Sequence, residues 1–139
     1  MDWVPWDDTL DTGHAEMDAD HKQLAGLFNR LRDAIDGGNA KASCAEVLDD
    51  IIRHTRAHFE LEQRLMIQHQ YPKAEQHAAE HAMLIRQAQD YRNSFDTESD
   101  ASRSAQIRFA DVWLAFHILF SDNELAAFLA RTRRRQGEP

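Results

Sequence analysis

The chain has 139 residues, of which 16 are Lys or Arg and 24 are Asp or Glu, so its formal net charge is −8. This acidic balance argues against a protein that binds nucleic-acid phosphates, because such binding needs clustered Lys and Arg. The single cysteine excludes an intramolecular disulfide bond and a cysteine-rich metal site.

Amphipathic periodicity predicts an all-α chain with helices over residues 18–36, 42–68, 72–94 and 101–121, followed by a short helix over 123–132. Gly37 and Gly38 end the first helix, and Pro72 begins the third. The polar segment 96–100 predicts a loop that supplies helix caps. Four long helices with short connections predict an antiparallel up-down four-helix bundle over about 18–121, within a single domain spanning 1–139. An N-terminal arm is expected to pack on it through Trp3 and Trp6.

No apolar run approaches the roughly 20 residues that a membrane crossing needs. The first eight residues have neither the early positive charge nor the apolar segment of a signal peptide. We therefore expect a cytoplasmic protein without a membrane span.

Polar residues occupy core-facing positions on all four long helices. A lone histidine at such a position is usually a hydrogen-bonded core residue, because a buried polar group needs a partner. Six convergent polar residues would need six separate explanations of that kind, whereas one metal site accounts for all of them. These residues are His21, His58, Glu62, His77, His81 and His117.

Spacing along the helices indicates which side chains share a face. His58 and Glu62 are four residues apart, as are His77 and His81, so each pair lies on one side of its helix. Asp122 follows His117 by five residues, which on a regular helix turns it about 140° away. Asp122 therefore faces inward only at a fraying helix end or at a distortion.

Five imidazoles and two carboxylates are more ligands than one ion needs, so two metals that share the two carboxylates divide the set sensibly. Imidazole suits Fe, Zn, Cu and Ni, whereas carboxylate favours iron or manganese. The chain lacks a Glu-x-x-His motif, which argues against the ferritin-like di-iron class of oxidases and iron-storage proteins.

In this order the residues resemble those of the hemerythrins, and more closely those of the bacterial hemerythrins. The likeness covers roughly residues 3–125. It includes the segment 18–24, His58-Phe59 before Glu62, Met66 before Tyr71-Pro72, and Trp113-Leu114 before His117-Ile118.

The resemblance implies a non-haem centre of two iron ions with an oxo or hydroxo bridge. One iron would be held by His77, His81 and His117, the other by His21 and His58, with Glu62 and Asp122 bridging both. The second iron would then keep an open position at which dioxygen binds reversibly.

A dry apolar wall favours reversible binding, because water and protons would otherwise complete the reduction of dioxygen. Phe59, Leu114 and Ile118 neighbour ligand positions and are the predicted oxygen pocket. Each of them also fits ordinary core packing, and both roles are compatible.

We therefore expect an oxygen carrier, storage or delivery protein, not an enzyme, with a possible protein partner that receives the oxygen. The alternatives are a di-iron oxidase or peroxidase, or a sensor of oxygen or nitric oxide that uses the same centre. His54 is expected to be a non-ligand, while His14 and His69 are expected to be solvated. The basic segment 131–135 predicts a solvated helix end stabilised by the helix dipole, or else a docking tail for an acidic partner.

Overall fold

The computed structural model describes residues 10–37 and 41–135. Within these ranges it contains helices and no strand, which confirms the predicted all-α class. The helices are α1 (Ala15–Asp36), α2 (Lys41–Gln68), α3 (Ala74–Ser94), the short 3₁₀ helix η2 (Phe95–Thr97), α4 (Asp100–Phe116), the π-helical turn η3 (His117–Asp122) and α5 (Asn123–Arg135).

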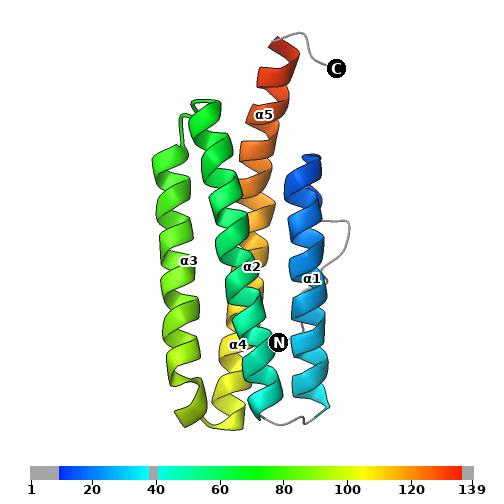
Figure 1. The fold of residues 1–139 in the computed structure, drawn as a ribbon, viewed down its shortest axis with the longest axis vertical. Helices are drawn as coiled ribbons and strands as arrows, with labels where there is room; N and C mark the ends of the chain where they lie inside the picture. The colour runs from blue at the N-terminus through cyan, green and yellow to red at the C-terminus, as the bar shows by residue number, and fades with distance from the viewer. Residues whose placement is uncertain (1–9, 38–40, 136–139) are drawn as a thin grey trace.

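Successive long helices run in opposite directions, so the predicted up-down bundle is confirmed (Figure 1). α1 packs against α2, and α2 packs against α3. The predicted arm through Trp3 and Trp6 lies outside the described residues, and so does the side chain of Trp113. No described helix is both long and apolar enough to cross a membrane.

The predicted short C-terminal helix is confirmed as α5, but it continues the direction of α4. Phe116 and Asn123, on either side of η3, have right-handed helical backbone angles, so α4, η3 and α5 form one continuous rod. The backbone N–H of Asn123 donates to the carbonyl of Ile118, five residues earlier, which is the hydrogen bond that defines a π-helical turn. The turn therefore absorbs one extra residue without interrupting the rod.

Local hydrogen bonds and turn geometry account for where α1, α3 and α4 begin. α1 starts three residues earlier than predicted, because the His14 ring accepts a hydrogen bond from the backbone N–H of Met17. α3 starts at Ala74 and not at Pro72, which lies in a turn after the left-handed residue Gln70 (φ 53°). Ser99 caps α4 as the sequence predicted, since its hydroxyl accepts from Ser102 N at 3.1 Å.

The core consists of two apolar clusters with a polar layer between them. The larger cluster fills one end of the bundle and includes Leu24, Phe59 and Ile118. The smaller cluster contains Met17, Met66, Tyr71, Leu125 and Leu129. On α1, α2 and the α4–α5 rod, the predicted metal ligands lie in sequence between residues of the two clusters. A polar layer with apolar packing on both sides is shielded from water.

Candidate metal centre

All seven predicted ligands are buried in this layer. Glu62 and Asp122 are completely inaccessible to solvent, and the five imidazoles are between 2% and 6% exposed. Ionised carboxylates at such depth need partners, because an unpaired buried charge is very unfavourable. The seven residues are His21, His58, Glu62, His77, His81, His117 and Asp122.

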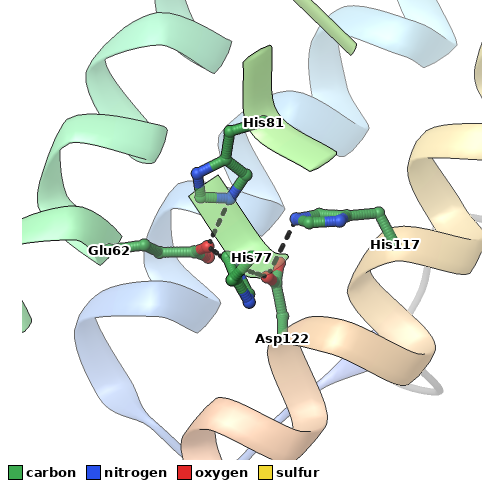
Figure 2. Close-up of side chains that lie close together, drawn as sticks. All are labelled: Glu62, His77, His81, His117 and Asp122. Carbon is green, nitrogen blue, oxygen red and sulfur yellow. Dashed lines mark hydrogen bonds and ion pairs between the residues drawn. The ribbon is translucent and has the colours of Figure 1, made fainter. Parts of the chain in front are cut away.

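The potential ligand atoms form two groups that share both carboxylates. One group contains Glu62, His77, His81, His117 and Asp122, which Figure 2 shows converging from three segments of the chain. The other group contains His21, His58, Glu62 and Asp122. Within each group all ligand atoms lie within 4.8 Å of one another. The structure thus separates the five histidines into a group of three and a group of two. The role of each residue as a metal ligand stays a prediction.

Each carboxylate directs one oxygen to each group. Glu62 Oε1 lies 2.8 Å from His77 Nε2 and 3.0 Å from His81 Nε2. Its other oxygen, Oε2, lies 2.6 Å from His58 Nε2.

Asp122 is divided in the same way. Its Oδ1 is 3.2 Å from the Nε2 atoms of His77 and His117, and its Oδ2 is 3.0 Å from His21 Nε2. A carboxylate that spans two donor groups in this manner has the arrangement that a bridging ligand requires.

The π-helical turn is what lets Asp122 face the centre. On a regular helix its spacing of five residues from His117 would turn it away, but a π-helical turn holds more residues per turn and aligns them. Both side chains are buried as a result. The sequence indicated that a distortion was needed, and the structure shows which one occurs.

Two further carboxylates hold the outer nitrogens of the histidines, and the sequence analysis did not identify them. Asp20 Oδ2 accepts from His58 Nδ1 at 2.9 Å, and Glu80 Oε2 accepts from His117 Nδ1 at 2.8 Å. Glu80 Oε2 also accepts from the hydroxyl of Ser121 at 2.6 Å. Such partners fix the tautomer and the ring orientation of a metal-binding histidine.

One signal in the sequence could have found these carboxylates. Asp20 directly precedes His21, and Glu80 directly precedes His81. A residue next to an inward-facing histidine lies about 100° around the helix, where it can reach a neighbouring helix.

The hydrogen-bonding pattern suits a bound cation. A neutral imidazole that donates through Nδ1 carries its lone pair on Nε2, so His58 and His117 present lone pairs to carboxylate oxygens. Two acceptors facing each other repel unless a proton or a metal cation lies between them. Within the described residues, His117 Nε2, Glu62 Oε2 and Asp122 Oδ1 are buried without a hydrogen bond of acceptable geometry. The donor set therefore fits a metal centre.

The electrostatics point the same way. Burial alone lowers the pKa of His58, but the adjacent carboxylates of Asp122 and Glu62 favour its protonated form and raise the pKa to about 11. The same carboxylates overcome burial at His77 and raise its pKa to about 9. Burial works against the charge of Asp122 as well, yet hydrogen bonds from the surrounding imidazoles keep its pKa well below the ordinary value. Without metal the cluster retains protons, and a metal ion would displace them.

The three predicted pocket residues lie beside this centre in the larger apolar cluster. The Phe59 ring stacks on the His81 ring, with centroids 3.7 Å apart and planes 7° apart. It also meets the edge of the His117 ring at 5.7 Å. Leu114 and Ile118 are buried in the same cluster as Phe59. Their contact with dioxygen stays a prediction.

The remaining histidines lie outside the two groups of ligand atoms. His54 is exposed, and His69 is partly buried near the end of α2. His14 was expected to be solvated but caps α1 through its ring nitrogen.

Comparisons with known proteins agree with this geometry. Residues 12–129 match the family model described as the Hemerythrin HHE cation binding domain. A bacteriohemerythrin of Pseudomonas aeruginosa is 30% identical over 138 residues, covering 99% of this chain and 87% of the relative. A bacteriohemerythrin of Stenotrophomonas maltophilia is 29% identical over 126 residues, or 91% and 81% of the two chains. A hemerythrin-like protein of Naegleria gruberi is 26% identical over 117 residues, or 84% and 86%.

Proposed function

The chain belongs to the hemerythrin family, and we propose that its buried cluster holds two iron ions and binds dioxygen reversibly. In this proposal His77, His81 and His117 serve one iron, His21 and His58 serve the other, and Glu62 and Asp122 serve both. Two ferrous ions would supply the affinity for dioxygen and the electrons that its binding demands.

One observation carries the proposal: the two groups share both carboxylates but differ by one histidine. Two metals held in this way would have unequal numbers of protein ligands. The metal with fewer histidines would keep a position for an exogenous ligand, as catalytic and ligand-binding metal sites do.

The chain's own residues would protect that position. Phe59, Leu114 and Ile118 exclude water from one side of the layer, and Asp20 and Glu80 hold the orientations of His58 and His117. Among the described residues, no carboxyl or imidazole group outside the seven is buried. A reversible carrier benefits from this, because a nearby buried acid could deliver protons that complete the reduction of dioxygen.

A second candidate function, oxidation of a small organic substrate, has one observation in its favour. An apolar cavity of about 360 Å³ lies between the helices, and its lining includes Thr55 and Leu114. Each of them precedes a predicted ligand, His58 or His117, by three residues, so the cavity reaches within one helical turn of the centre. The cavity has a volume in the range that small-molecule sites occupy.

In the deciding experiment the protein is loaded with iron and reduced in the absence of oxygen. Oxygen is then admitted, and afterwards the oxygen is removed under vacuum. We expect two irons per chain and a visible band that appears with oxygen and disappears under vacuum. Irreversible oxidation with release of peroxide would favour the oxidase. One metal per chain, or zinc alone, would refute the proposal.

A matched pair of variants separates loss of the site from general damage. Glu62→Gln removes a shared carboxylate and should abolish binding of the iron pair. Glu60→Gln makes the same change on the exposed side of α2 and should leave binding intact. Equal iron contents in the two variants would contradict the assignment of Glu62.

A further inference from the structure

A second recess lies on the surface where α3 faces the end of α4 and η3, and it borders the proposed centre at His117. It has a volume of about 320 Å³, and we refer to it as the Glu80 pocket. Its lining includes Glu80, Met83, Phe116, Phe120 and Ser121, together with one side of His117.

Large apolar side chains around this pocket are unusually exposed. Phe120 is 65% exposed, Phe116 is 49% exposed and Met83 is 45% exposed. The two phenyl rings are stacked, with planes 8° apart and centroids separated by 5.8 Å. Leu119, in the same helical turn, is also exposed. A cluster of exposed apolar side chains often marks an interaction site, whereas single exposed apolar residues are common on any surface.

Of the two carboxylate oxygens of Glu80, only Oε2 is hydrogen-bonded to other described residues. Glu80 Oε2 accepts from His117 Nδ1 and from Ser121 Oγ. Oε1 makes no hydrogen bond or ion pair with the residues that the structure describes, and 45% of the Glu80 side chain is exposed. A cationic group entering the pocket could bind Oε1 without displacing His117.

We propose that the Glu80 pocket is the docking site of a protein partner that inserts an arginine or lysine side chain flanked by apolar residues. The cation pairs with Glu80 Oε1, and its stem and neighbours cover Phe116 and Phe120. An arginine also stacks favourably on an aromatic face.

Two features favour a protein over a small molecule or a second copy of this chain. The exposed apolar side chains continue past the pocket lining to Leu119, which is 37% exposed, so covering all of them takes a surface larger than the pocket. The formal net charge of −8 attracts a basic partner and repels another copy of the chain.

The site goes beyond the proposed oxygen binding, and docking itself does not depend on it. An effect of docking on the metal centre does rest on the proposed function, because the carboxylate that meets the partner also orients His117. A bound partner would therefore contact a residue that holds a predicted metal ligand.

The test uses the full-length protein labelled for NMR at the Met methyl groups and the backbone amides. The probe is the peptide acetyl-Leu-Arg-Phe-amide, and its matched control replaces arginine with citrulline, which is neutral and of similar shape. We expect the arginine peptide to shift the Met83 methyl signal and to bind about three- to fivefold more tightly than the citrulline peptide.

Variants identify the contacts that carry this binding. Phe120→Ala should weaken the arginine peptide about tenfold, whereas Ile67→Ala, which removes an exposed apolar side chain elsewhere, should leave it unchanged. Glu80→Gln should abolish the preference for arginine over citrulline. Phe120 and Ile67 are both largely exposed, so neither variant should impair folding.

Several results would overturn the proposal. Equal affinity for the two peptides would remove the role of the cation, and absence of peptide binding would remove the site. Benzamidine binding as tightly as the peptide would indicate a small-molecule site. A dimer that sedimentation velocity detects, and that Phe120→Ala dissociates, would indicate a second copy.

Discussion

Replacing Glu80 with glutamine tests whether residues behind the histidines tune the centre. The substitution keeps the size of the side chain but removes its charge. In the native protein this carboxylate joins two positions of the π-helical turn, since one oxygen accepts from both His117 and Ser121. A neutral amide oxygen is a weaker acceptor for both donors.

The expected magnitude follows from the geometry. A hydrogen bond to an ionised acceptor contributes about 1.5–3 kcal/mol, against about 0.5–1.5 kcal/mol between neutral groups. Because 45% of the Glu80 side chain is exposed, water screens part of this difference, and we expect the free energy of unfolding to fall by about 1 kcal/mol. Loss of such a partner typically weakens metal binding about 10- to 100-fold.

The assay is a competition for iron against a chelator of known affinity, together with the visible spectrum of the loaded protein and its denaturant unfolding curve. Glu60→Gln is the control, because it makes the same change at an exposed site on α2. A merely structural role for Glu80 would lower stability but leave the spectrum and the iron affinity unchanged. That outcome would refute the reasoning, as would equal behaviour of the two variants.

One deletion and three other substitutions test separate features. Deleting Leu119 should convert the π-helical turn to regular helix while keeping both of its ligands inward, so the iron content should be unchanged; loss of iron would contradict this. Thr55→Val removes a buried hydroxyl that has no hydrogen-bond partner among the described residues, and should raise the free energy of unfolding by about 1 kcal/mol; a comparable decrease would show that the hydroxyl is satisfied. Burial raises the pKa of Asp18, but hydrogen bonds from Thr12 and Gly13 outweigh it and hold the pKa below 3.8. Because Asp18 is only partly buried, water screens these bonds, and Asp18→Asn should lower the free energy of unfolding by about 0.5 kcal/mol at neutral pH. This difference should shrink as the pH falls through the lowered pKa; a pH-independent difference would exclude the carboxylate. Leu114→Asp should admit water and shorten the lifetime of the oxygenated form relative to Leu114→Met, and equal autoxidation rates would remove Leu114 from the pocket.

Much of the fold and the candidate site is determined by local periodicity. Apolar residues at helical spacing define the long helices, and histidines and a glutamate at the same spacing predict a polar layer in the core. His58 with Glu62, and His77 with His81, share a face on any regular helix, so their convergence needs no knowledge of the neighbours. The likeness to the hemerythrins is also readable from the sequence, because it rests on the order and spacing of these residues along the chain.

The partners that residues find on neighbouring helices could not be predicted from the sequence and are seen only in the tertiary structure. Asp122 faces inward because a π-helical turn forms, and the bond between Ser121 and Glu80 that accompanies it crosses between helices. Periodicity likewise places Asp20 on a helix face but does not identify the ring that it holds.

The division of each shared carboxylate between two groups of histidines is also a tertiary result. Helical spacing is a property of one segment, whereas the rotation and register of packed helices decide which atoms meet. Periodicity in the sequence therefore predicted six of the seven residues of the polar layer, whereas the inward position of Asp122 depends on the π-helical turn. The packing decided how their oxygens and nitrogens are shared, and it left the phenyl rings beside Glu80 exposed on the surface.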